Sequence, residues 1–166
     1  MVDQRKARRS SKEAGLNPVV PDVFFPRGVY APTITAFEKN EDVSLPGTRA
    51  FVRFLLAEGI DGLVPLGSSG EPLALTIAER KAVLDAVTEE AGGKVPIMAG
   101  IVEYSTRSAI DLAQHAKAAG CKGLMVMPPH GFRPPKRDVF DHFRRIREAV
   151  GLHVMLYNVP VRAGSI

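Results

Sequence analysis

The chain has 166 residues, of which 45% are hydrophobic and 24% charged, as in an ordinary water-soluble globular domain. No apolar run approaches the ~20 residues of a membrane-spanning helix, and the single cysteine, Cys121, excludes an internal disulfide. The formal net charge is +4, but five basic and two acidic residues among the first 16 account for +3 of it. The other 150 residues, 17 basic and 16 acidic, carry only +1 and lack the basic face of a nucleic-acid-binding protein.

Residues 1–24 form a basic leader that we expect to be disordered, and residues 25–166 form the folded domain. The leader contains Arg5, Lys6, Arg8, Arg9 and Lys12, without the apolar stretch of a secretory signal. The lone cysteine fits a reducing compartment. These features predict a cytoplasmic protein with neither a membrane nor a nucleic-acid partner.

The predicted elements alternate between short apolar strands and amphipathic helices. Five strands are expected at 28–35, 62–66, 95–101, 123–127 and 153–158, each bounded by glycine or proline. Four helices are expected between them, at 45–58, from 76 to near 92, at 106–119 and at 137–150. None of the strands alternates cleanly between apolar and polar residues, which is typical of parallel strands buried on both faces.

Capping residues mark the helix ends. Ser44 is the expected N-cap of the first helix, and Thr76 with Glu79 forms a capping-box pattern at the start of the second. A glycine follows each helix, as expected for a C-terminal stop. In the fourth helix, one buried face is predicted from the spacing of its apolar residues, which are Val139, Phe140, Phe143, Ile146 and Val150.

The order of elements predicts an α/β fold, specifically part of a (β/α)8 TIM barrel. The segment 59–64 resembles 120–125, and such internal repetition favours a barrel over a doubly wound sheet. The first strand is also not followed by the glycine pattern of a dinucleotide-binding fold. One unit takes roughly 30 residues, so the chain holds the first five strands and four helices of a barrel of about 250 residues.

Polar residues follow the second and fifth strands, at the edge where parallel α/β folds bind small anions. After the second strand, Gly67-Ser68-Ser69-Gly70 offers two hydroxyls and turn amides that can hold a carboxylate. Tyr157 stands at the end of the fifth strand, and Arg162 follows it. Tyr157 can move a proton if hydrogen bonds link it to Ser68, and Arg162 can clamp a second carboxylate. Each of these residues also has a plainer structural interpretation. The two serines could be ordinary turn residues, Tyr157 could be a packed core aromatic, and Arg162 could be an exposed cation.

No set of His, Cys, Asp and Glu has metal-ligand spacing, so we expect no metal.

The chain resembles the pyruvate-dependent class I aldolases of the dihydrodipicolinate synthase and N-acetylneuraminate lyase superfamily over residues 28–166. The matching motifs are the pyruvate-carboxylate loop 67–71, the helix opening 75–80 and the fifth-strand motif Tyr157-Asn158-Val159-Pro160. Such a protein forms an imine with pyruvate, needs no external cofactor, and adds the resulting enamine to an aldehyde. The resemblance also implies a homotetramer built as a dimer of dimers.

The resemblance implies a role for each candidate site residue. Tyr157 would be the proton-relay tyrosine and Ser68 the relay hydroxyl. Ser69, with the turn amides of Gly67 and Gly70, would hold the pyruvate carboxylate. Arg162 stands where the synthases bind the carboxylate of the aldehyde substrate. It therefore favours a 4-hydroxy-tetrahydrodipicolinate synthase of lysine biosynthesis, acting on aspartate semialdehyde, over the neuraminate lyases.

The chain departs from the family pattern at two places. The imine-forming lysine of the family lies on the sixth strand, and this chain ends before that strand, so we expect an incomplete barrel without its nucleophile. The loop after the fourth strand carries His130 and Gly131 in place of a tyrosine pair. We expect His130 to be a surface loop residue, with substitution in proton transfer as the alternative. Two other functions stay open: another 2-oxo-acid or sugar-acid aldolase, and a non-catalytic half-barrel that binds a partner chain.

Overall fold

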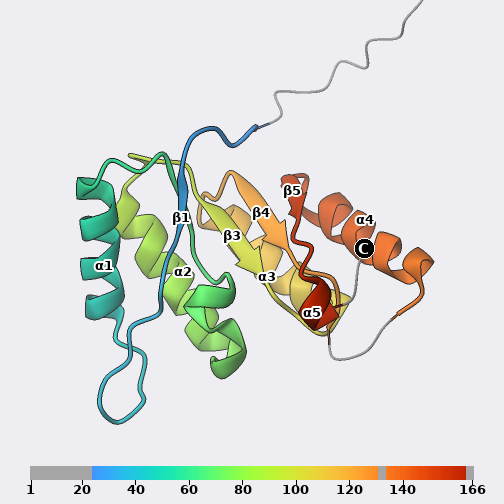
Figure 1. Cartoon of the computed structure of the whole chain (residues 1–166), viewed down its shortest axis with the longest axis horizontal. Helices are drawn as coiled ribbons and strands as arrows, with labels where there is room; N and C mark the ends of the chain where they lie inside the picture. Colours follow the sequence, from blue (N-terminus) through green and yellow to red (C-terminus); the bar gives the residue numbers. More distant parts are fainter. Residues whose placement is uncertain (1–23, 131–133, 164–166) are drawn as a thin grey trace, which may run out of the picture.

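The computed structural model describes residues 24–130 and 134–163. Strands and helices alternate along the chain as predicted (Figure 1). The elements are β1 (Tyr30–Pro32), α1 (Leu45–Ala57), β2 (Gly62–Val64), α2 (Ile77–Ala91), β3 (Met98–Ile101), α3 (Thr106–Ala118), β4 (Gly123–Val126), α4 (Lys136–Val150) and β5 (His153–Leu156). Two 3-10 turns, η1 (Ser68–Gly70) and η2 (Pro72–Ala74), and a short helix α5 (Pro160–Ala163) were not predicted. The predicted leader lies outside the described residues, apart from Phe24.

All the strand pairs are parallel and follow the order of the chain. β1 pairs with β2, and β3 pairs with β4, which pairs with β5. A parallel bridge between Leu63 and Ile97 joins the two groups. Sequential order without a reversal is the arrangement of a (β/α) barrel, whereas a doubly wound sheet reverses its strand order. The carboxyl ends of β2 and β5 therefore lie along one rim, on either side of β3 and β4.

The hydrophobic core fills the space between the strands and the helices. Alternate strand residues Leu63, Ala99, Ile101, Leu124 and Val126 are buried in this layer with Val52, Val83, Leu112 and Ile146 of α1 to α4. Because strand side chains alternate between faces, Met98, Gly100 and Met125 point to the opposite, barrel-interior side. On the last described strand, β5, Met155 and Leu156 stay exposed.

The helix ends confirm the capping predictions. The Ser44 hydroxyl accepts a bond from the Gly47 amide, 3.4 Å away. The Thr76 hydroxyl accepts from the Glu79 amide, and the Glu79 carboxylate accepts from the Thr76 amide at 2.7 Å, which completes a capping box. Gly92 ends α2 with a φ of 54°, in the left-handed region that glycine adopts without steric cost.

The predicted buried face of α4 is wrong at Phe140, whose side chain is 70% exposed. The other four residues already form a complete buried stripe, because they are spaced by four, three and four residues: Val139, Phe143, Ile146 and Val150. Phe140 lies beside this stripe. His142, only 3% exposed, takes the buried place instead, and its Nδ1 lies 2.9 Å from the Thr106 hydroxyl of α3.

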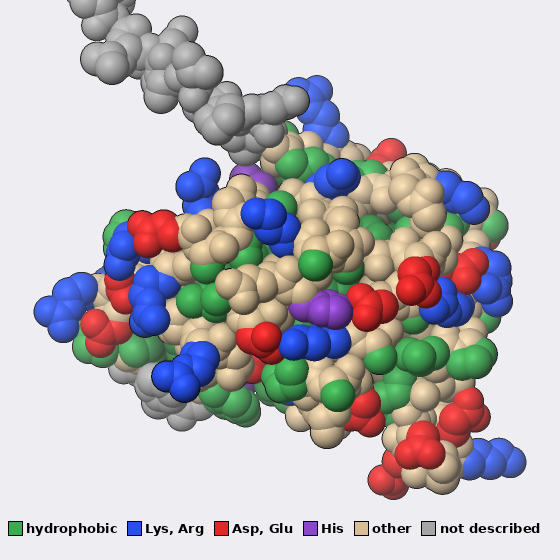
Figure 2. All heavy atoms as spheres, turned by 180° about the vertical axis from the view of Figure 1, so that it is seen from behind, with side chains coloured by type: hydrophobic (Ala, Val, Ile, Leu, Met, Phe, Trp, Pro, Cys, Tyr) green, Lys and Arg blue, Asp and Glu red, His purple; other side chains and the backbone are tan. Residues whose placement is uncertain are grey.

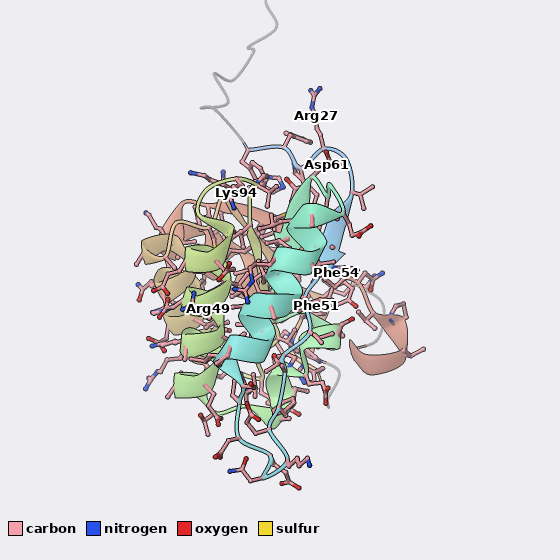
Figure 3. All side chains as sticks on the ribbon, turned by 90° about the vertical axis from the view of Figure 1, so that its left-hand side faces the viewer. Arg27, Arg49, Phe51, Phe54, Asp61 and Lys94 are labelled. Carbon is pink, nitrogen blue, oxygen red and sulfur yellow. The ribbon has the colours of Figure 1, made fainter. Side chains whose placement is uncertain are left out.

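The outer surface carries charges of both signs, and an aromatic pair lies on α1. Acidic and basic side chains are interspersed over the face shown in Figure 2, as the near-neutral charge of the domain predicts. On α1, Phe51 and Phe54 lie beside each other (Figure 3), with ring centroids 6.1 Å apart. Within the part of the chain that the structure describes, no helix has both the length and the apolar character to cross a bilayer.

Candidate active site

A tight loop after β2 carries the two predicted serines. The backbone reverses through η1, where the Gly70 amide bonds the Gly67 carbonyl at 2.9 Å. Within residues 24–130 and 134–163, the amides of Ser68 and Ser69 donate to no backbone carbonyl, as is usual for the first residues of a helical turn. Gly67 and Gly70 are buried, Ser68 is half-buried and Ser69 is exposed. The loop can thus offer two hydroxyls and two amides to an anion.

The structure brings Ser68 and Tyr157 together across the rim of the sheet. The two hydroxyl oxygens lie 3.4 Å apart, and either can donate the hydrogen bond. The Tyr157 amide bonds the Val126 carbonyl at 2.8 Å, which keeps the tyrosine in register just beyond β5. Since β3 and β4 lie between β2 and β5, the hydroxyls meet above the carboxyl ends of these two strands. The contact that a proton relay between them requires is therefore present.

Arg162 is placed only in part. It belongs to the short helix α5, which follows Tyr157 by three residues, but its side chain is outside the described part of the structure. Its role as a carboxylate clamp stays a prediction.

Gly100 of β3 is a site residue that the sequence analysis missed. A Cβ at this position would lie 2.4 Å from the Leu66 carbonyl oxygen and 2.6 Å from the Gly67 nitrogen. The Gly100 amide also donates to the Pro65 carbonyl at 2.7 Å. The missing side chain lets β3 support the peptide that leads into η1. A glycine inside a strand is a known sign of such close backbone approach, so the signal was available.

A buried ion pair holds the far end of the same loop. The Arg80 guanidinium of α2 bonds the Glu103 carboxylate, which follows β3, and its Nε donates to the Leu75 carbonyl at 3.1 Å. Arg80 is 7% and Glu103 6% exposed. Charged residues are rarely this buried unless they are paired, and no local pattern in the sequence indicates the pairing. The pair joins the end of the loop to the segment after β3.

His130 is not the surface residue that was expected. It is only 6% exposed, and its ring stacks against Tyr104, with centroids 4.2 Å apart. The prediction failed because a loop residue was assumed to be exposed, whereas the segment after β3 packs over the segment after β4. Gly131 and the two residues after it lie outside the described residues.

None of the lysines in residues 24–130 and 134–163 is buried. Lys39, Lys94, Lys117, Lys122 and Lys136 are exposed, and Lys81 pairs with Asp111 at 2.8 Å. A nucleophilic lysine needs desolvation or a neighbouring cation to lose its proton near neutral pH. No group of three or more potential metal ligands gathers anywhere in 24–130 or 134–163, and the expected absence of a metal stays a prediction.

Comparison with known proteins gives a consistent result. The model of the dihydrodipicolinate synthetase family matches residues 25–166. The chain is 38% identical over 137 residues to the 4-hydroxy-tetrahydrodipicolinate synthase of Bradyrhizobium diazoefficiens, covering 82% of this chain and 46% of the relative. The chain thus spans about half the length of the curated relatives it matches.

Solved structures of similar proteins agree in fold. A prophage protein of the dihydrodipicolinic acid synthase family from E. coli K12, in complex with pyruvate, is 34% identical with a TM-score of 0.79. A catalytic lysine mutant of the Ruminococcus gnavus sialic acid aldolase is 27% identical with a TM-score of 0.78. Each alignment covers 82% of this chain and 46% of the other. The predicted fold, a TIM barrel represented by its first five strands and four main helices, is confirmed.

Proposed function

Because the chain belongs to the dihydrodipicolinate synthetase family, we propose that it carries the carboxylate-binding loop and the proton-relay tyrosine of a pyruvate-dependent class I aldolase. The favoured activity of the whole protein is that of a 4-hydroxy-tetrahydrodipicolinate synthase, which is the name of its curated relatives. The observation that carries the proposal is the 3.4 Å contact between the Ser68 and Tyr157 hydroxyls, which come from opposite sides of the rim.

The site residues fit the steps of this reaction. A lysine amine adds to the pyruvate carbonyl and water leaves, giving an imine; loss of a methyl proton gives the enamine. The enamine carbon attacks the aldehyde carbonyl carbon, and the former aldehyde oxygen takes up a proton. Water, or an amine on the aldehyde substrate, then adds to the regenerated imine and releases the product from the lysine. The Ser69 hydroxyl and the turn amides would hold the pyruvate carboxylate, while Ser68 and Tyr157 would pass the protons. Arg162 would bind a carboxylate on the aldehyde, and the family resemblance assigns the lysine to a sixth strand.

Titration of the 166-residue chain with pyruvate, followed by amide NMR, tests the binding part of the proposal. The resonances of residues 67–70 should shift, and Ser69→Ala should weaken binding about tenfold, because its charge-assisted hydrogen bond to the carboxylate is lost. Tyr157→Phe should leave the pyruvate affinity nearly unchanged, because the phenol is assigned to proton transfer and not to the carboxylate. Tyr30→Phe is its matched control, since Tyr30 lies on β1 against Gly62. Binding that left these resonances unmoved would contradict the assignment of the loop.

Borohydride reduction in the presence of pyruvate, read by intact mass, tests the covalent part. We expect no reduced adduct on the 166-residue chain and an adduct on a version extended through a sixth strand. An adduct on the shorter chain would mean that one of its own lysines can form the imine.

The remaining proposals have their own tests. If the extended protein keeps its activity after dialysis against a chelator, that result would support the absence of an external cofactor. Sedimentation would test the proposed homotetramer. Cell fractionation would test the cytoplasmic location.

A sugar-acid aldolase is the second candidate. Two observations favour it: the similarity to a sialic acid aldolase, and His130 stacked on Tyr104 where the synthases carry a tyrosine pair. Turnover of aspartate semialdehyde by the extended protein, compared with turnover of sugar aldehydes, separates the two. Preference for the sugar aldehydes would reject the synthase proposal.

A further inference from the structure

We propose that Thr35 is a positioning residue for the Ser68–Tyr157 pair. Its buried hydroxyl would hold the loop at the Gly70 carbonyl, so that the Ser68 hydroxyl stays within reach of the Tyr157 phenol. The role of the pair in proton transfer rests on the proposed function, whereas the positioning of Ser68 by Thr35 does not.

The contact between Thr35 and the loop is short and shielded from water. The Thr35 hydroxyl donates to the Gly70 carbonyl at 2.7 Å, and its side chain is 5% exposed. Gly70 closes the same 3-10 turn that begins with Ser68, so a movement of the Gly70 carbonyl moves Ser68 with it. Buried hydrogen bonds of this kind are costly to leave unmade, since the carbonyl then has no water to replace the lost donor.

Thr35 is itself held in place from two sides. The amide of Thr33 bonds the Val64 carbonyl of β2 at 3.1 Å. The next amide after Thr35, that of Ala36, donates at 3.1 Å to the hydroxyl of Thr48, a fully buried residue of α1. The segment after β1 is therefore fixed to both β2 and α1, and it can act as a rigid support.

The loop needs such a support in its middle. Its two ends are fixed by other groups: Gly100 bonds Pro65 before the turn, and Arg80 bonds Leu75 after it. Between them, Leu66 has a φ of 59° and Glu71 a φ of 50°. Residues other than glycine keep this left-handed conformation only where their surroundings impose it. Among the residues that the structure describes, Thr35 is the one outside the loop whose side chain bonds the backbone of the stretch between these two strained residues.

The approach of Gly70 to its support is also close. A Cβ on Gly70 would lie 3.2 Å from the Thr33 carbonyl oxygen and 3.8 Å from the Thr35 hydroxyl. The glycine lets the loop backbone rest directly on the segment 33–35. Contact of backbone with backbone leaves little room for Ser68 to shift while the Thr35 bond is intact.

The test measures the Ser68–Tyr157 contact directly, without any ligand. The chain has only three tyrosines, so each ring carbon of isotope-labelled tyrosine can be assigned by NMR. Ser68→Ala should shift the Tyr157 resonance in the otherwise wild-type chain. In a Thr35→Val background that resonance should already be displaced, and Ser68→Ala should change it less than half as much, because coupled sites are non-additive. Thr35→Ser should restore the wild-type coupling.

Two controls separate positioning from general destabilisation. Thr88→Val removes another threonine hydroxyl that bonds a backbone carbonyl, the one to Leu84 at 3.0 Å near the opposite end of α2, and it should leave the coupling unchanged. Thr35→Ala is measured as well, because it removes the hydroxyl without setting a methyl group against the Gly70 carbonyl. The proposal is overturned if Ser68→Ala shifts the Tyr157 resonance equally with and without the Thr35 hydroxyl, or does not shift it at all.

Pyruvate affinity gives a second readout that separates the two proposals. Thr35→Val should weaken pyruvate binding about fivefold, the equivalent of one lost hydrogen bond, while Thr88→Val keeps the wild-type affinity. A chain that binds no pyruvate but shows the predicted NMR coupling would reject the proposed function and keep the role of Thr35. A chain that binds pyruvate equally well with valine at position 35 would reject the role of Thr35 alone.

Discussion

Replacing Glu103 with leucine should destabilise the fold more than replacing both partners of its ion pair. Glu103→Leu leaves the Arg80 guanidinium buried without its carboxylate, and Arg80 is only 7% exposed. A buried charge stripped of its partner costs about 3–5 kcal/mol. For a domain of this size, that loss should lower Tm by about 10 °C or more.

The double variant Arg80→Met/Glu103→Leu removes both charges and should recover most of this loss. Apolar replacement of a whole buried pair is often neutral or stabilising. Arg80 also donates to the Leu75 carbonyl, so a residual cost of about 1 kcal/mol remains for that lost bond. The informative result is whether the double variant has a higher or a lower free energy of unfolding than the single variant.

Urea unfolding followed by circular dichroism measures both variants. Glu148→Gln is the control, because Glu148 pairs with Arg144 at 2.9 Å on the exposed side of α4, and such pairs contribute about 0.5 kcal/mol or less. The reasoning is refuted if Glu103→Leu costs no more than this control, or if the double variant is less stable than the single one.

Three further predictions concern a glycine, a histidine and the cysteine. Gly100→Ala should cost about 1–3 kcal/mol in denaturant unfolding, as overpacking does, since its Cβ would meet the backbone of Leu66 at 2.4 Å; an unchanged midpoint would contradict the close approach. Burial lowers the pKa of His142 to about 4, so the unfolded chain, with a histidine pKa near 6.5, binds the proton first. The stability present above pH 6.5 should therefore fall as the pH drops to about 4, by on the order of 3 kcal/mol at most, and His142→Gln should flatten the unfolding free energy over this range. Burial, with a smaller effect of Asp85, raises the pKa of Cys121 to about 12, so its thiol should resist alkylation at pH 8 until denaturant unfolds the chain; rapid labelling of the native protein would show that the thiol is accessible.

Local signals in the sequence predicted the features that depend on neighbouring residues. Ser44 and Thr76 cap helices because their hydroxyls reach amides only three residues away, so a few neighbouring residues are enough to reveal the pattern. The positions of Ser68 and Tyr157 at the rim also followed from local reasoning, since both lie close to the carboxyl ends of apolar strands. Parallel strands in chain order then bring their carboxyl ends to one rim.

The missed features depend on contacts between distant segments. Thr35 and Gly70 are 35 residues apart, and Arg80 and Glu103 are 23 apart, so nothing in either local sequence indicates the partner. The exposure of Phe140 was mispredicted because Phe140 also lies three residues before Phe143. The spacing alone cannot distinguish a residue within the buried stripe from one beside it. His130 was misplaced for a tertiary reason as well, because its ring packs against Tyr104, which is 26 residues away in the sequence and follows a different strand.

The Ser68–Tyr157 contact also bears on when the site can form during synthesis. The two residues are 89 positions apart, and chains are made at about 5–20 residues per second, so Ser68 leaves the ribosome several seconds before its partner exists. During that interval the nascent chain can complete the α1–α2 layer and the bond from Thr35 to the loop. The Ser68 hydroxyl cannot yet form its contact, because Tyr157 has not been synthesised. A fluorescent or NMR signal from the hydroxyl pair would therefore report the moment at which the fifth strand docks, and would distinguish a fully docked chain from one that has only its first four strands in place.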